Sequence, residues 1–164
     1  MQALFIGGIK SGKSKCAEEY VLKSTSTTPI YLATTEFIDE EMQEKIRQHK
    51  LQREEKFHTL EEPLDLLSST KEYDSIILVE CMSMWINNML YHKYNEKEIL
   101  IALQKLLASN KDFVFVINDV STSVVSENPL TRKFVNINGK VSQILAAHCN
   151  DVFHVTAGIS VKIK

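Results

Sequence analysis

The chain has 164 residues, of which 44% are hydrophobic and 24% are charged, and this composition excludes disordered and fibrous proteins in favour of a single folded domain over residues 1–164. Its 19 Lys and Arg against 21 Asp and Glu give a formal net charge of -2, which provides no broad positive surface for nucleic acid or an anionic membrane. The three cysteines form no C-x-x-C pair and no apolar run approaches the roughly 18 residues of a membrane span, so we expect a cytoplasmic protein without disulfides, zinc or a transmembrane helix.

The first predicted strand, residues 3–6, leads directly into a sequence that is typical of phosphate-binding loops. This loop matches the pattern G-x-x-x-x-G-K-S, and a helical pattern over residues 13–23 follows it. Its glycines allow a sharp turn in which backbone N–H groups converge on phosphate oxygens at the N-terminus of the helix. We expect Lys13 to neutralise the β- and γ-phosphates of a nucleotide and the Ser14 hydroxyl to ligate Mg²⁺. The alternative is an ordinary glycine-rich turn. The eight loop residues are Gly7, Gly8, Ile9, Lys10, Ser11, Gly12, Lys13 and Ser14.

A histidine, His49, lies on the second predicted helix, residues 39–52, which follows a predicted strand over residues 30–33. It comes three residues after Ile46 and seven after Met42, so it lies on or beside the apolar stripe of this helix. From this spacing alone, an interior histidine is favoured over a nucleophile.

An acidic residue, Glu80, follows the third predicted strand, residues 75–79. Proteins with a phosphate-binding loop place at this position the carboxylate that holds Mg²⁺ or its water shell. A glutamate is longer than the commoner aspartate and could also reach another ligand, such as a base N–H. The alternative is a carboxylate that only marks the solvent-exposed end of a strand.

The second half of the chain continues the alternation of helices and strands. It predicts a helix, a strand, a helix and a strand in turn, at residues 96–109, 113–118, 130–148 and 152–156. Asn118 and Asp119 end the strand at an edge where ligands bind, although a helix-capping turn explains them equally well. Gly139 weakens the prediction of the last helix, since glycine costs about 1 kcal/mol relative to alanine in a helix interior.

The predicted strands are mostly apolar rather than alternating, which indicates burial on both faces. We therefore expect an α/β fold with a mostly parallel central sheet flanked by helices. The other four histidines have no metal-ligand spacing and are expected to be structural: His58, His92, His148 and His154.

Six linked segments in this order resemble the bifunctional adenosylcobinamide kinase / adenosylcobinamide-phosphate guanylyltransferase family of cobalamin biosynthesis. They are the glycine-rich loop, Y-L-A-T, the D-E-E-M to H-K stretch, V-E-C, E-N-P-L-T-R and G-I-S-V-K-I-K, at residues 7–14, 31–34, 39–50, 79–81, 127–132 and 158–164. The resemblance runs from the first strand to the last residues.

The resemblance implies a RecA-like P-loop NTPase fold, a homotrimer and two reactions. In the first, ATP or GTP with Mg²⁺ phosphorylates adenosylcobinamide. In the second, GMP passes from GTP to adenosylcobinamide phosphate through a GMP-histidine on His49, which reverses the interpretation from spacing. The further nucleotide contacts that it implies are Ala33, Thr34, Thr35, Lys50, Leu51, Gln52, Arg53, Glu61 and Glu80, with Ser14 and Glu80 at the metal.

Three departures from the family pattern occur in this chain, one of which is a short segment after Trp85. The family often has two adjacent histidines before a lysine, whereas this chain has Gln48 and then His49, which leaves one candidate nucleophile. The family's glycine after its N-E-V run is replaced by Ser121, which changes the backbone freedom of that loop. Two alternative functions stay open: a small-molecule kinase without guanylyltransferase activity, and a non-catalytic nucleotide-binding module.

Overall fold

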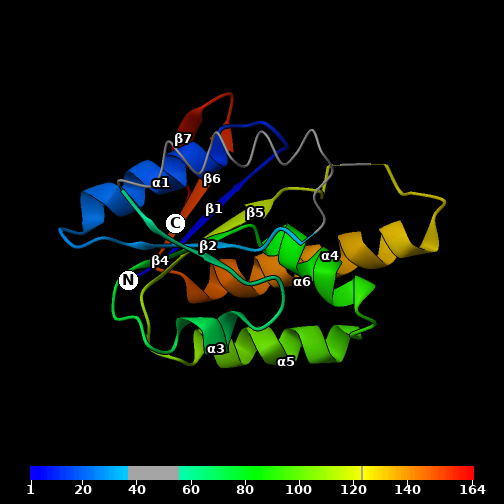
Figure 1. The fold of residues 1–164 in the computed structure, drawn as a ribbon. Helices are drawn as coiled ribbons and strands as arrows, with labels where there is room; N and C mark the ends of the chain where they lie inside the picture. Colours follow the sequence, from blue (N-terminus) through cyan, green and yellow to red (C-terminus); the bar gives the residue numbers. More distant parts are fainter. Residues whose placement is uncertain (37–55, 123) are drawn as a thin grey trace.

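A seven-stranded sheet organises the structure, a computed structural model that describes residues 1–36, 56–122 and 124–164 (Figure 1). The strands lie in the order β3-β2-β4-β5-β1-β6-β7, and every neighbouring pair is parallel except β6 and β7. The predicted α/β class with a mostly parallel sheet is therefore confirmed. The strands are β1 (Gln2–Gly7), β2 (Ile30–Ala33), β3 (His58–Glu61), β4 (Ile77–Glu80), β5 (Phe113–Asn118), β6 (Asp151–Thr156) and β7 (Ile159–Lys162).

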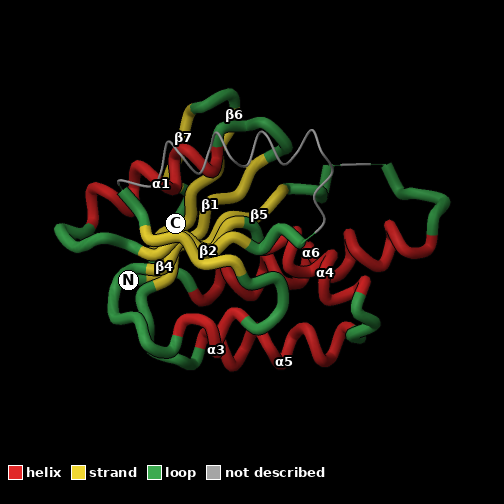
Figure 2. The backbone as a smooth tube through the Cα atoms, viewed as in Figure 1, coloured by secondary structure: helices red, strands yellow, loops and turns green. Residues whose placement is uncertain are grey.

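Helices cover both faces of the sheet (Figure 2). Helix α1 packs on one face through Ala17 and Val21, which join a cluster with Phe5 of β1. The other helices contribute to a larger cluster on the opposite face. Among the described residues, none of the helices has both the length and the hydrophobicity of a membrane span. The helices are α1 (Lys13–Ser24), α3 (Leu66–Thr70), α4 (Met82–Tyr91), α5 (Glu96–Leu107) and α6 (Pro129–His148).

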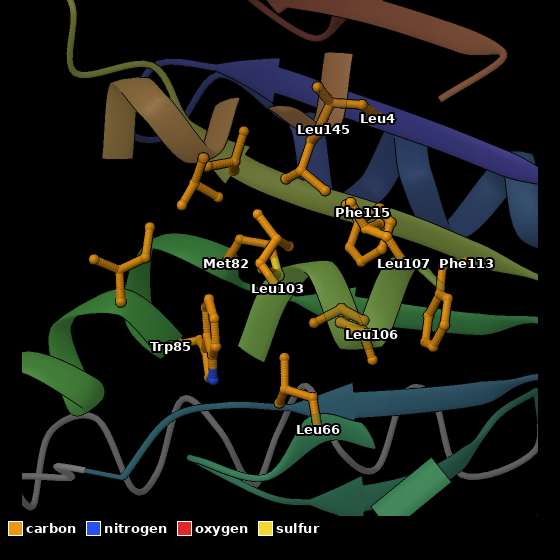
Figure 3. Close-up of a cluster of buried hydrophobic side chains, with 14 of the residues drawn as sticks. Leu4, Leu66, Met82, Trp85, Leu103, Leu106, Leu107, Phe113, Phe115 and Leu145 are labelled. Carbon is orange, nitrogen blue, oxygen red and sulfur yellow. The ribbon is translucent and has the colours of Figure 1, made fainter. Parts of the chain in front are cut away.

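The larger cluster joins the sheet to α3, α4, α5 and α6 (Figure 3). Phe113 and Phe115 of β5 stack with ring centroids 5.3 Å apart and belong to the same cluster as Trp85. Trp85 is 1% exposed, and its indole N–H donates to the carbonyl oxygen of Leu64 at 2.9 Å. Because this hydrogen bond satisfies the indole N–H, burial of the large side chain stabilises the fold by its full hydrophobic contribution of roughly 1.5–3 kcal/mol.

The predicted elements that fall in the described residues are confirmed, with bounds that shift by at most two residues. The strand predicted at residues 75–79 is β4, which begins at Ile77 and includes Glu80. Gly139 lies inside α6, which is continuous from Pro129 to His148. The helix predicted at residues 39–52 lies outside the described residues.

Four elements are not among those that the sequence predicts: β3, α3, α4 and β7. Helix α4 begins two residues after Glu80 and buries apolar side chains, so its apolar positions continue the apolar run of β4 without a visible change of period. Helix α3 has five residues, too few for a helical period to be recognised. All four residues of β7 are exposed, so no burial pattern marks this edge strand.

Candidate functional site

Residues 7–14 connect β1 to α1 and form a turn whose backbone is fixed by hydrogen bonds. The backbone N–H of Ser11 donates to the carbonyl of Gly8 at 3.2 Å, and Gly12, at the start of α1, has a φ of 91°. A Cβ on Gly7 would lie 2.4 Å from the carbonyl oxygen of Val155 in β6, so the neighbouring strand requires a glycine here. The strand-turn-helix context that the sequence predicts for a phosphate-binding loop is present.

The Lys13 side chain lies folded over this turn. It is 8% exposed, and its amine donates to the carbonyl of Gly8 at 3.3 Å. Burial lowers the pKa of Lys13, while electrostatic interaction with Cys81 and Glu80 raises it in part. The amine is thus held at the loop by one neutral acceptor, which leaves its other donors for phosphate oxygens.

A second polar atom of the loop is suited to a ligand. The Ser11 hydroxyl is buried and has no hydrogen-bond partner among the described residues. An unsatisfied buried polar group costs about 1–3 kcal/mol, so this hydroxyl favours an acceptor such as a phosphate oxygen. The loop is therefore built to gain hydrogen bonds when an anion binds.

Glu80 ends β4 close to this loop. Burial raises the pKa of Glu80, and a hydrogen bond from Ser14 and the charge of Lys13 lower it in part. No cluster of three His, Cys, Asp or Glu side chains that could hold a metal occurs in the described part of the chain. Mg²⁺ is commonly held by one or two protein oxygens together with substrate phosphates, and the joined side chains of Ser14 and Glu80 fit that arrangement.

The ends of β2, β3 and β4 bring three of the predicted nucleotide contacts into one row. Ala33 of β2 is in register with Glu61 of β3 on one side and with Glu80 of β4 on the other. Thr35 follows two residues after Ala33 at the same edge of the sheet. Parallel strands thus gather these residues at the edge where ligands of open α/β sheets bind.

Thr34 has a different place from its neighbours. It is fully buried, and its hydroxyl donates to the Cys81 carbonyl at 2.9 Å and accepts from the Cys81 N–H at 2.8 Å. Its carbonyl accepts from Asn88 of α4 at 2.6 Å. Thr34 therefore joins β2, the residue after β4, and α4, and a nucleotide contact through it stays a prediction.

The candidate nucleophile and its neighbours are not placed by the structure. The predicted site residues that lie outside the described residues are His49, Lys50, Leu51, Gln52 and Arg53. Their nucleotide contacts stay predictions.

The turn between β6 and β7 packs on the loop, a contact that the sequence does not reveal. The backbone N–H of Gly158 donates to the carbonyl of Ser11 at 2.7 Å. An added Cβ on Gly12 would lie 3.0 Å from the Cα of Gly158. Gly12 and Gly158 are 146 positions apart in the chain, so no local sequence pattern could predict the contact.

Replacing Gly12 with alanine should damage this packing. Its φ of 91° lies in the left-handed region, where a Cβ costs about 1–2 kcal/mol, and the Gly158 backbone leaves little space. We expect a lower free energy of unfolding in urea and a nucleotide affinity reduced by about tenfold. Gly139→Ala is the matched control, because nothing lies within 4 Å of its added Cβ and a helix interior gains about 0.5–1 kcal/mol from the change. A Gly12→Ala protein that binds nucleotide as tightly as wild type would show that this geometry is unimportant.

Comparison with known sequences gives a match over nearly the whole chain. A sequence profile of the family described as "Cobinamide kinase / cobinamide phosphate guanyltransferase" matches residues 3–163. The chain is 33% identical to "Bifunctional adenosylcobalamin biosynthesis protein CobU" of Escherichia coli and 34% identical to the protein of that name from Salmonella typhimurium, over 100% of both chains in each case. It is 32% identical to "Bifunctional adenosylcobalamin biosynthesis protein CobP" of Pseudomonas aeruginosa, over 100% of this chain and 98% of that one.

Comparison with solved structures supports the fold. A KaiC-like protein from Pyrococcus horikoshii superposes with a TM-score of 0.52 at 14% identity, over 93% of this chain and 69% of that one. The flagellar accessory protein FlaH from Methanocaldococcus jannaschii gives a TM-score of 0.53 at 13% identity, over 99% and 77% of the two chains. These similarities confirm the RecA-like P-loop architecture and, at such low identity, concern the fold alone.

Proposed function

This chain belongs to the cobinamide kinase / cobinamide phosphate guanyltransferase family, and we propose that it phosphorylates adenosylcobinamide and then transfers GMP from GTP to the adenosylcobinamide phosphate. The observation that carries this proposal is the glycine loop with Lys13 folded over it and Glu80 bonded to Ser14, in a chain that matches its relatives over their full length. The enzyme is accordingly a transferase of cobalamin biosynthesis with two activities.

In the kinase reaction, the chain contributes positioning and charge. The loop N–H groups and the Lys13 ammonium would hold the triphosphate of ATP or GTP while the γ-phosphoryl group passes to the hydroxyl of the cobinamide arm. Ser14 and Glu80 would hold Mg²⁺, which neutralises charge on the phosphates when bound. The Ser11 hydroxyl would gain the hydrogen-bond partner that it lacks among the described residues.

In the guanylyltransferase reaction, His49 would act as the nucleophile. A neutral imidazole attacks the α-phosphorus of GTP, the bond to pyrophosphate breaks, and a phosphoramidate holds GMP until the phosphate of the cobinamide arm takes it. Since an unperturbed histidine has a pKa of about 6.5, much of it is neutral at pH 7 and needs no strong base. Family resemblance supports this role.

Further nucleotide contacts would come from the row at the ends of β2, β3 and β4. Ala33 is in register with Glu80 and Glu61, and Thr35 follows two residues later, so this row can contact a nucleotide bound beyond the sheet. Lys50, Leu51, Gln52 and Arg53 would add contacts beside His49.

Two properties of the assembled protein complete the proposal. A homotrimer would allow a neighbouring subunit to complete each site, and sedimentation equilibrium tests this directly. A cytoplasmic location agrees with three free cysteine thiols and with the supply of nucleoside triphosphates there.

The proposal is tested with adenosylcobinamide, Mg²⁺ and either ATP or GTP. We expect adenosylcobinamide phosphate to form with a nucleotide that supports the kinase reaction, whether ATP or GTP. Adenosylcobinamide-GDP should then form only when GTP is present. Phosphorylation without GMP transfer would instead identify a small-molecule kinase. Tight nucleotide binding without either product would identify a binding module.

A further inference from the structure

The carboxyl end of β5 lies between the phosphate-binding loop, which follows β1, and Glu80 at the end of β4. Strand β5 pairs with β1, which carries the loop, and with β4, which carries Glu80. Asn118, its last residue, is in register with Gly7. The next residue, Asp119, donates its backbone N–H to the Gly7 carbonyl at 2.9 Å. The backbone of Asp119 therefore lies beside Gly7, the first residue of the phosphate-binding loop. Asp119 directly follows the strand that lies between this loop and Glu80, a proposed metal ligand.

The Asp119 carboxylate is oriented and ionised. Its Oδ1 accepts from the Ser121 backbone N–H at 2.9 Å and from the Ser121 hydroxyl at 2.5 Å. These hydrogen bonds lower the pKa of Asp119, and the charge of His154 on β6 acts in the same direction. The Asp119 side chain is 20% exposed. A carboxylate in this state is negative at neutral pH and remains accessible to a ligand.

The second carboxylate oxygen, Oδ2, makes no short contact with the neighbouring His154 side chain. The His154 Nε2 atom lies 4.0 Å from Oδ2, too far for a hydrogen bond but close enough for attraction when the ring is protonated. The His154 side chain is 46% exposed, so this side of Asp119 borders solvent. Oδ2 can therefore accept a hydrogen bond from a substrate without losing the bonds to Ser121.

A closed ring of buried hydrogen bonds fixes the end of β5. The Asn118 N–H donates to the Ser83 hydroxyl at 3.0 Å, that hydroxyl donates to Asn138 Oδ1 at 2.7 Å, and Asn138 Nδ2 donates to the Asn118 carbonyl at 3.0 Å. Ser83 is 2% exposed and Asn138 is 1% exposed. Buried, satisfied networks of this kind rigidify the elements that they join, here β5, α4 and α6. Asp119 therefore follows a strand whose end is held rigidly by these hydrogen bonds.

Four other carboxylates at this end of the sheet already have partners or proposed roles, and one of them, Glu61, is a proposed nucleotide contact. Glu80 is partly buried and belongs to the proposed metal site. Glu36 contacts His92 at 2.8 Å, and Glu62 accepts from two backbone N–H groups at 2.8 and 2.9 Å. Asp119 differs from them because it combines contact with the loop backbone, a fixed orientation and an accessible oxygen.

We propose that Asp119 is a catalytic residue of the kinase reaction, whose carboxylate orients the acceptor hydroxyl of the cobinamide arm and takes its proton. This assignment rests on the proposed function. The hydroxyl oxygen forms a bond to the γ-phosphorus, and the bond from that phosphorus to the oxygen bridging to the β-phosphate breaks. The nucleoside diphosphate leaves with that electron pair, and the hydroxyl proton passes to Asp119 and then to water. In other phosphoryl-transfer enzymes an aspartate accepts the proton of a substrate hydroxyl in this way.

Asp119→Asn tests the assignment, because an asparagine keeps the acceptor for Ser121 and loses the negative charge. With adenosylcobinamide and ATP, we expect kcat for phosphorylation to fall by about 10²–10³ while the KM for ATP changes by less than about threefold. GMP transfer from GTP to separately supplied adenosylcobinamide phosphate should be unchanged. Asp119→Glu should recover at least about tenfold of the lost kcat, since it restores a carboxylate. Asp74→Asn, at a fully exposed carboxylate away from the loop, is the matched control and should behave as wild type.

The results that overturn the assignment are distinct from a failure of the proposed function. A phosphorylation kcat within about threefold of wild type in Asp119→Asn would remove the catalytic role. Equal loss of phosphorylation and GMP transfer, or a misfolded Asp119→Asn without recovery in Asp119→Glu, would show a structural role instead and also overturn it. If the wild-type protein itself phosphorylates no cobinamide, the proposed function fails, and the assignment fails with it.

Discussion

Replacing Lys13 with alanine should lower kcat for cobinamide phosphorylation by about 10²–10³. The Lys13 amine is held at the loop by the Gly8 carbonyl, so its charge is already positioned where negative charge develops on the phosphates. Truncation removes this charge without replacing it. The measurement is initial-rate kinetics with adenosylcobinamide at saturating MgATP, together with the nucleotide Kd from equilibrium titration.

Lys23→Ala is the control for the change of net charge. Lys23 lies in the last turn of α1 and is exposed, whereas Lys13 is buried in the first turn of the same helix. The control should keep kcat within about twofold, and both variants should remain folded, as measured by thermal unfolding. Full kinase activity in Lys13→Ala would remove the loop from the mechanism.

Replacing His49 with alanine should separate the two activities. We expect GMP transfer to adenosylcobinamide phosphate to fall by at least about 10³, because an alanine cannot form the phosphoramidate. Phosphorylation of adenosylcobinamide should stay within about threefold of wild type, since the loop, Lys13 and Glu80 are unchanged. The two products are quantified by chromatography in separate assays, each started from its own corinoid substrate.

His148→Ala is the matched control for loss of an imidazole. His148 is exposed at the end of α6 and takes no part in the proposed site. Both activities should be retained in this variant. Equal loss of both activities in His49→Ala would contradict a role confined to GMP transfer.

The sequence predicts the sheet and the loop because both depend on local patterns. Apolar runs mark the central strands, and the glycine motif needs only a strand before it and a helix after it, which β1 and α1 provide. Helix α4 is not predicted from the sequence, because its buried residues continue the apolar run of β4. Strand β7 is not predicted either, because its side chains are exposed and no burial pattern marks it.

The candidate site could be predicted only in part, since several of its contacts join residues far apart in the chain. Glu80 is predicted at the metal from its place after a strand, and the structure brings it to Ser14. The ring through Ser83, Asn118 and Asn138 depends on how α4 and α6 pack against β5, which no periodicity reveals. For His49, helical spacing favours an interior position, and only the family resemblance points to a nucleophile.

The direct test of the two-reaction account uses GTP labelled in its α-phosphate. Wild-type protein incubated with this GTP and Mg²⁺, then digested and mapped by mass spectrometry, should carry GMP on the peptide that contains His49, with a bond that acid breaks and alkali does not. The label should leave the protein when adenosylcobinamide phosphate is added, and it should be absent from His49→Ala. Rapid GMP transfer to adenosylcobinamide phosphate by a protein that never carries label on His49 would contradict the account.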